Sequence, residues 1–153
     1  MMRSILTVAL LTILFSQGVS ASPDLDWNDS QIRWHDYQSG LAESRRSGRP
    51  ALVLLYADWC PTCHTYQKLF SNPQIVRLAQ QVVMIRVNAP EQPGLSNQFA
   101  DDGAYLPRTY AIDPSGRRVE VISRHPQFRH FYEATDVAGF SNLLRRVIAL
   151  SGE

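Results

Sequence analysis

Cysteine is scarce in this chain, since Cys60 and Cys63 are the only two among 153 residues. A small exported protein stapled by disulfides carries more cysteines at wider spacing, so that class is excluded. The chain also has no large excess of charge of either sign, because it has 15 Lys and Arg residues and 14 Asp and Glu residues. This balance gives no sign of the basic surface that binds nucleic acid. The chain also has no internal repeat and no low-complexity tract. It therefore has the composition of one globular domain.

Long hydrophobic runs are missing after the N-terminus. Residues 1–21 have the pattern of a secretory signal, with Arg3 as its positive region, an apolar core at 5–15 and a small-residue cleavage site at 19–21. The apolar core is shorter than the roughly 20 residues that span a bilayer. We therefore expect cleavage and a soluble exported protein that begins near Ser22.

The rest of the chain is expected to form one domain. Residues 22–36 are polar and irregular, and we interpret them as an N-terminal extension whose Trp27 and Trp34 pack on the body. Residues 37–150 carry the patterns of a single domain. Residues 150–153 do not form a retention signal of the Lys-Asp-Glu-Leu type, which favours a bacterial periplasm over an endoplasmic reticulum lumen.

Apolar periodicity predicts alternating strands and helices. Strands are expected at 51–57 and 82–88, and a hairpin of two more at 107–113 and 117–122; helices are expected at 37–47, 62–70, 73–80 and 137–148. Residues 89–103 are expected to be mostly loop, with a helical turn near 95–99, and residues 124–134 stay unassigned, with a solvated polar loop as their default. This order predicts an α/β fold with a central mixed β-sheet flanked by helices on both faces.

Both cysteines lie where a buried strand meets the start of a helix. A Cys-X-X-Cys thiol at such a position feels the positive end of the helix dipole, and its pKa is lowered from about 8.5 to roughly 3.5–7.5. Pro61 suits the first helical turn, since it has no N–H to leave unpaired. The spacing therefore favours redox chemistry, with a thiolate at Cys60 as the nucleophile.

Other interpretations of the same residues stay open. With His64 the motif becomes Cys-X-X-Cys-His, the attachment signature of c-type haem, which needs a second axial ligand such as Met84, His125 or His130 on a mostly helical body. The strand signals argue against that body. An inert disulfide would close too small a loop to constrain the unfolded chain much, and metal ligation by the pair is a further minor alternative. We expect no cofactor and no metal.

The chain resembles the thioredoxin superfamily over about residues 34–150. The residues that carry the resemblance are Tyr56-Ala57-Asp58-Trp59-Cys60-Pro61-Thr62-Cys63, Leu106-Pro107 before the hairpin, and the closing helix. The first set, with Phe70-Ser71-Asn72-Pro73, is similar to the C-terminal periplasmic domain of the membrane disulfide reductase. Residues 103–108 and 113–116 are similar to the small anterior-gradient thioredoxins of the endoplasmic reticulum.

The resemblance implies roles for five residues. Cys60 would be the exposed attacking thiol and Cys63 the buried resolving thiol. Trp59 would wall the site, Pro107 would be a cis proline facing the disulfide, and the Leu106 backbone would pair with an extended client segment. The implied partners are client proteins with disulfides and a membrane electron donor that restores the dithiol. Reduction is the favoured direction, and we expect a monomer.

Two positions depart from the family pattern. Many thioredoxins have a buried acid six residues before the first cysteine, where this chain has Leu54, and the reductase domain has an acid four residues after the second, where this chain has Gln67. Asp58 and His64 are therefore candidate modulators of the thiols. A protonated His64 would favour a thiolate at Cys60 by Coulomb attraction. The remaining alternative is a binding module that keeps the fold while its cysteines do little.

Overall fold

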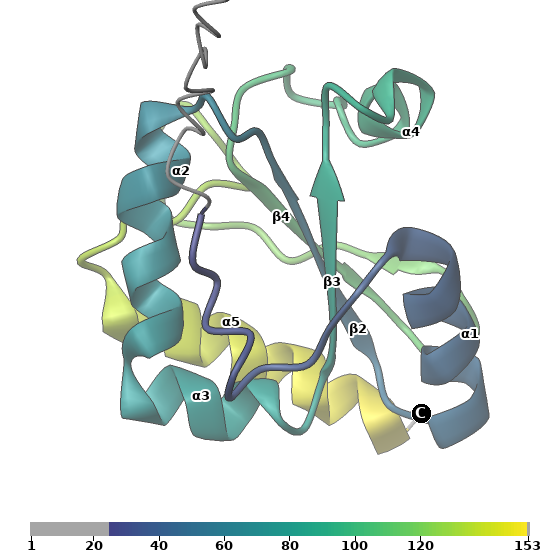
Figure 1. Ribbon diagram of the computed structural model, residues 1–153. Helices are drawn as coiled ribbons and strands as arrows, with labels where there is room; N and C mark the ends of the chain where they lie inside the picture. Colours follow the sequence, from purple (N-terminus) through teal and green to yellow (C-terminus); the bar gives the residue numbers. More distant parts are fainter. Residues whose placement is uncertain (1–24, 153) are drawn as a thin grey trace, which may run out of the picture.

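The computed structural model describes residues 25–152, so the predicted signal, residues 1–21, lies outside the described residues. The elements in chain order are β1 (Trp34–His35), α1 (Tyr37–Ser47), β2 (Ala51–Tyr56), α2 (Pro61–Tyr66), a 3₁₀ turn (Gln67–Ser71), α3 (Pro73–Ala79), β3 (Val83–Asn88), α4 (Pro93–Gln98), β4 (Arg108–Ile112), β5 (Arg118–Val119), α5 (Val137–Ala149) and a second 3₁₀ turn (Leu150–Gly152) (Figure 1). Among the described residues no helix has the length and apolar character to cross a membrane.

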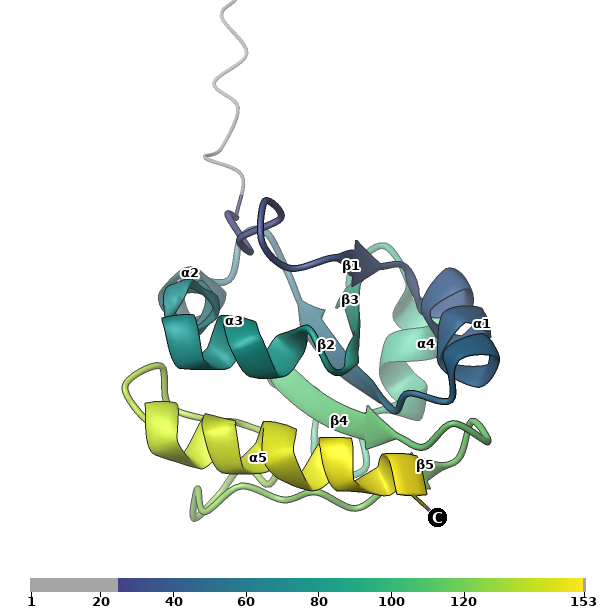
Figure 2. The ribbon, with the colours of Figure 1, turned by 90° about the horizontal axis from the view of Figure 1, so that it is seen from below.

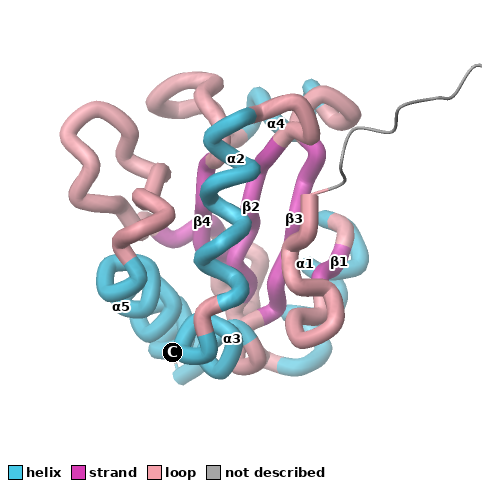
Figure 3. Tube along the Cα trace, turned by 60° about the vertical axis from the view of Figure 1, so that its left-hand side comes forward, coloured by secondary structure: helices cyan, strands magenta, loops and turns pink. Residues whose placement is uncertain are grey.

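The five strands form one mixed sheet in the order β1-β3-β2-β4-β5. Strands β1 and β2 run parallel to β3, whereas β4 runs antiparallel to β2 and β5 antiparallel to β4. Strand β2 thus lies at the centre of the sheet, as the tube view shows (Figure 3). Its position explains why Ala51 to Leu55 are all buried.

Helices cover both faces of the sheet. Seen from below, α2, α3 and α5 lie on one side and α1 and α4 on the other (Figure 2). Side chains alternate along β2, so Leu52 and Leu54 join the core under the first group while Val53 and Leu55 join the core under the second. The predicted α/β architecture with a mixed sheet and helices on both faces is confirmed.

Helix α1 has clear signals at both ends and matches its predicted range. The Asp36 carboxylate accepts a hydrogen bond from the Ser39 amide at 2.9 Å and caps the first turn. Gly48 ends the helix in the left-handed conformation, with φ of 67°. Gly40 lets the helix approach β3 closely, because a Cβ at this position would lie 2.3 Å from Cγ1 of Ile85.

Residues 25–36 contribute to the fold more than the sequence suggested. Trp27 is 1% exposed, and its ring packs edge to face on Trp34, Tyr56 and Phe70, which confirms the expectation that these tryptophans pack on the body. The same segment also supplies strand β1, which was not predicted because two residues carry too little periodicity to reveal a strand.

Other boundaries differ from the prediction. The helix expected at 62–70 starts at Pro61 and continues after Tyr66 as the 3₁₀ turn. Residues 93–98 form α4 where mostly loop was expected, with Pro93 at the first helical position. The second hairpin strand, expected at 117–122, is only Arg118–Val119. Its turn is as predicted, since Asp113 accepts hydrogen bonds from the Ser115 and Arg117 amides and Gly116 has φ of 92°.

Candidate active site

The cysteine pair lies at the start of α2, just beyond the end of the central strand. Cys60 is the N-cap residue, and its Sγ accepts a hydrogen bond from the Cys63 amide at 3.2 Å. Both cysteines are free thiols. The expectation of an exposed Cys60 is wrong, because this residue is 4% exposed and Cys63 is 0% exposed. A client can therefore reach the Cys60 sulfur only from a surface hollow that Cys60 helps to line.

The segment before β4 brings Leu106 and Pro107 against this sulfur. The Leu106–Pro107 peptide bond is cis, which confirms the predicted geometry of that bond. The Cys60 thiol points at the Leu106 carbonyl oxygen across 3.8 Å. Because β4 pairs antiparallel with β2, with Arg108 opposite Leu55, this bond is held beside the strand end that carries the cysteines.

Two hollows flank Leu106. The first has a volume of about 460 Å³ and is bordered on one side by Trp59, Cys60 and Pro61 and on the other by Ala104, Tyr105 and Leu106. Trp59 is 71% exposed, as a wall residue of a binding surface would be. The second hollow, of about 330 Å³, is lined by Thr62, Tyr105, Leu106, His125, Phe128, Phe131 and Glu133. An extended chain laid across Leu106 would contact both.

The segment that the sequence left unassigned builds the second hollow. Ser123 and Arg129 close a loop through a backbone hydrogen bond of 2.7 Å, and Nδ1 of His125 accepts the backbone N–H groups of Gln127 and Phe128 at 3.2 and 3.1 Å. The default of a solvated polar loop holds for residues 126–129, which are exposed, but is wrong for His130 and Tyr132, which are 4% and 5% exposed. Sequence reasoning missed these residues because only tertiary packing brings them to the cysteines.

Arg108, the residue after the cis proline, is a second feature that the sequence analysis missed. Its side chain is 0% exposed and donates hydrogen bonds to the Gly103 carbonyl at 2.7 Å and to the Ser96 hydroxyl at 2.7 Å. These bonds tie α4 and the loop after it to β4, so Arg108 shapes one wall of the first hollow. The available signal was a charged residue at the start of β4, a strand that is otherwise mostly apolar.

Burial governs the protonation of Cys63, the more deeply buried of the two cysteines. Loss of solvent raises the pKa of the Cys63 thiol strongly, and the hydrogen bond with Cys60 and the nearby Asp58 carboxylate raise it further. Leu54 is fully buried in β2, so the position of the family's acid is apolar. Asp58 is exposed and accepts a hydrogen bond from the Asn88 amide group at 2.8 Å.

His64 lies on the first turn beyond the cysteines but its ring is engaged with the backbone. Its Nε2 lies 2.8 Å from the Asp58 carbonyl oxygen, so an N–H there donates to this oxygen. Met84, one of the second haem ligands considered above, is 1% exposed within the central sheet. The mostly helical body that a covalent haem carrier needs is absent from residues 25–152, because a five-stranded sheet forms the centre of the fold.

Comparison with known proteins places the chain in a family. A family model described as Thioredoxin-like matches residues 33–114, so the chain belongs to the thioredoxin-like family. It is 27% identical to the human Anterior gradient protein 2 homolog over 126 residues, which cover 81% of this chain and 70% of that protein. It is 30% identical to Anterior gradient protein 1 of Xenopus laevis over 116 residues, which cover 74% of this chain and 62% of that protein.

Solved structures show the same fold. A thioredoxin from Thermus thermophilus superposes with a TM-score of 0.63 at 24% identity, covering 80% of this chain and 91% of that one. The C-terminal domain of Neisseria meningitidis DsbD in its reduced form superposes with a TM-score of 0.52 at 15% identity, covering 74% of this chain and 97% of that one.

Proposed function

We propose that this protein is an extracytoplasmic thiol–disulfide oxidoreductase that reduces client disulfides through Cys60 and Cys63. The observation that carries the proposal is the position of the Cys60 sulfur, 3.2 Å from the Cys63 amide and 3.8 Å from the Leu106 carbonyl, beside a cis proline. This arrangement leaves one sulfur at the floor of a surface hollow and a second sulfur within reach behind it. Membership of the thioredoxin-like family supports the assignment.

The reaction needs two exchange steps. The Cys60 thiolate attacks one sulfur of a client disulfide, so that a Cys60–client disulfide forms and the other client sulfur leaves as a thiolate that takes up a proton. Cys63 then loses its proton and attacks Cys60 Sγ, which forms the Cys60–Cys63 disulfide and releases the second client thiol. Two electrons pass from the protein to the client, and a dithiol donor at the membrane restores the reduced pair.

The client would lie across Leu106 as an extended segment, with Trp59 and the two hollows contacting its side chains. Asp58 and His64 are proposed as modulators rather than as participants, because Asp58 acts on Cys63 through its charge and His64 donates to the backbone. The protein is proposed to act in the periplasm as a monomer, after cleavage of residues 1–21.

Trapping tests the activity directly. The Cys63→Ser variant should accumulate mixed disulfides with client proteins at its home location, and Cys60→Ser should lose reduction of insulin disulfides and trap nothing. Equal activity of both variants and the unsubstituted chain would instead support a binding module. Direction is decided by equilibration with glutathione, where a potential near the roughly −120 mV of strong periplasmic oxidants would contradict the reductase assignment. The mass of the exported protein reports whether residues 1–21 are removed.

A further inference from the structure

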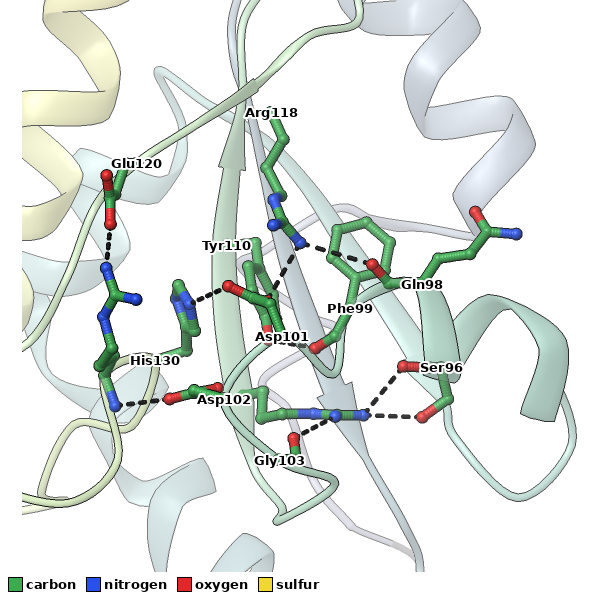
Figure 4. Close-up of polar contacts among 12 residues, drawn as sticks. Ser96, Gln98, Phe99, Asp101, Asp102, Gly103, Tyr110, Arg118, Glu120 and His130 are labelled. Carbon is green, nitrogen blue, oxygen red and sulfur yellow. Dashed lines mark hydrogen bonds and ion pairs between the residues drawn. The ribbon is translucent and has the colours of Figure 1, made fainter.

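Three side chains with metal-binding chemistry, Asp101, Asp102 and His130, come together near Tyr110 of β4 (Figure 4). Asp101 and Asp102 lie in the loop that leads from α4 to Pro107, and His130 comes from the segment that builds the second hollow. One ligand atom from each of the three lies within 4.8 Å of those of the other two. Only the fold brings His130 to these carboxylates, so no spacing in the sequence suggested the set.

His130 is buried, and neither of its ring nitrogen atoms makes a hydrogen bond. The residue is 4% exposed, and its ring lies over Tyr110 with the ring centroids 4.1 Å apart. Nε2 is 3.4 Å from Oδ2 of Asp101 but lacks hydrogen-bond geometry, and Nδ1 has no hydrogen-bond partner either. Leaving a buried polar group without a partner destabilises the fold. A ligand for the imidazole would remove this penalty.

In each carboxylate one oxygen accepts hydrogen bonds from neighbouring groups, and the other oxygen accepts none. Oδ2 of Asp102 accepts hydrogen bonds from the Tyr105 hydroxyl at 2.6 Å and the Arg129 amide at 2.8 Å, whereas Oδ1 is buried without a partner. Oδ1 of Asp101 accepts from Arg118 at 3.2 Å, and Oδ2 faces His130. Outer donors that orient ligand carboxylates in this way are typical of metal sites.

One pair of these ligand atoms already has the spacing that a small divalent ion requires. Zinc bonds to nitrogen and oxygen of about 2.1 Å place tetrahedral ligands about 3.4 Å apart, and His130 and Asp101 already have this separation, 3.4 Å. A hollow of about 250 Å³ beside them leaves room for a water molecule as the fourth ligand.

We propose that Asp101, Asp102 and His130 form a binding site for a divalent transition-metal ion, with zinc as the test ion. One imidazole and two carboxylates suit a first-row transition metal better than magnesium, which prefers oxygen ligands. The bound ion would fix the loop that precedes Pro107 to the segment that walls the second hollow. It would therefore hold together two borders of the groove beside Cys60. Arg118 already neutralises part of the charge on Asp101, so binding should be weaker than at a cysteine-rich structural site.

The experiment is a calorimetric zinc titration of the full chain with Cys60→Ser and Cys63→Ser, because free thiols would bind zinc themselves. We expect one zinc per chain. Asp101→Asn and His130→Gln should each weaken zinc binding at least tenfold. The matched control is Glu120→Gln, which removes a carboxylate from the rim of the same hollow and should change the affinity less than twofold.

Several results would overturn the site. Zinc affinity that is unchanged in Asp101→Asn would place the ion elsewhere, and no binding at millimolar zinc would exclude it. Equal weakening by Glu120→Gln, or displacement of zinc by a tenfold excess of magnesium, would indicate a nonspecific acidic surface. Asp101 is exposed, so its variant decides the matter even if His130→Gln does not fold. Because the background lacks both thiols, the outcome is independent of the proposed redox activity.

Discussion

Cys63 is the residue whose surroundings most directly set the rate of the proposed second step. Its pKa is raised far above neutral pH, chiefly by burial, so only a small fraction is thiolate. Below that pKa the thiolate fraction rises about tenfold with each pH unit. Release of a client from Cys60 should therefore accelerate steeply between pH 6 and 8.5. Stopped-flow fluorescence of Trp59, next to the mixed disulfide, can follow this release. A flat profile over this range would contradict the raised pKa.

Asp58 offers a test of how that proton leaves. Its charge adds to the pKa of Cys63 but is the smallest of the causes, and the carboxylate is exposed to solvent that screens it. Asp58→Asn should therefore speed client release by no more than about threefold. Slower release, by tenfold or more, would show instead that Asp58 accepts the Cys63 proton in place of the acids missing at Leu54 and Gln67. Asn88→Ala, which frees the carboxylate without removing it, is the matched control.

At the scale of elements, the loop of residues 123–129 depends on one imidazole. Nδ1 of His125 accepts hydrogen bonds from the backbone N–H groups of Gln127 and Phe128. Loss of these hydrogen bonds would release Phe128 from the wall of the second hollow. His125→Ala should raise the KM for a peptide client by about fivefold to thirtyfold, since each of the two hydrogen bonds contributes about 1 kcal/mol, and 1 kcal/mol corresponds to about a fivefold change.

His125→Asn is the control for this loop, because its side-chain oxygen can take the place of Nδ1 and should keep the KM near that of the unsubstituted chain. Reaction of Cys60 with a small disulfide that does not reach the second hollow should be the same in both variants. A KM that rises equally in both, or in neither, would show that the loop does not contact clients.

The contact of α1 with β3 gives a prediction about stability. A methyl group at Gly40 would meet Cγ1 and Cδ1 of the buried Ile85 at 2.3 and 2.6 Å, so Gly40→Ala should destabilise the protein by about 1–3 kcal/mol despite the better helix propensity of alanine. Gly94→Ala in α4 is the matched control, since nothing lies within 4 Å of its Cβ position, and it should be neutral or stabilising by up to about 1 kcal/mol. Urea unfolding of the two variants measures the contrast, which equal destabilisation would refute.

How far the sequence predicts these elements depends on the range of the interactions that form them. Helix α1 has caps that the sequence reveals, and strands β2 and β3 have a recognisable apolar pattern. The cysteine pair is recognisable from a motif of four consecutive residues. Strand β1 forms through its pairing with the edge of β3, which no local pattern reveals. Helix α4 has little apolar periodicity. The second hollow, and the cluster of Asp101, Asp102 and His130, each bring together segments that lie more than 20 positions apart in the chain, so no local pattern could reveal them.

At the scale of the whole molecule, the open question is where the folded domain begins. The sequence pattern predicts an extension at residues 22–36 and a domain at 37–150, whereas the match to the thioredoxin-like family begins at residue 33. In the structure β1 extends the sheet beside β3, and Trp27 fills a space bounded by Trp34, Tyr56 and Phe70. Tyr56 ends the strand that leads to the cysteines, so packing of Trp27 supports the site from behind.

Substitution of Trp27 tests this arrangement. Trp27→Ala should destabilise the protein by about 3–5 kcal/mol, because it removes a large buried ring and leaves a cavity against three aromatic residues. Trp27→Phe should lose much less, since it keeps most of the packing and removes an indole N–H that has no hydrogen-bond partner. The free energies come from urea unfolding of the reduced proteins. If Trp27→Ala unfolds at the same urea concentration as the unsubstituted chain, residues 25–33 are an appendage, and the domain begins at β1.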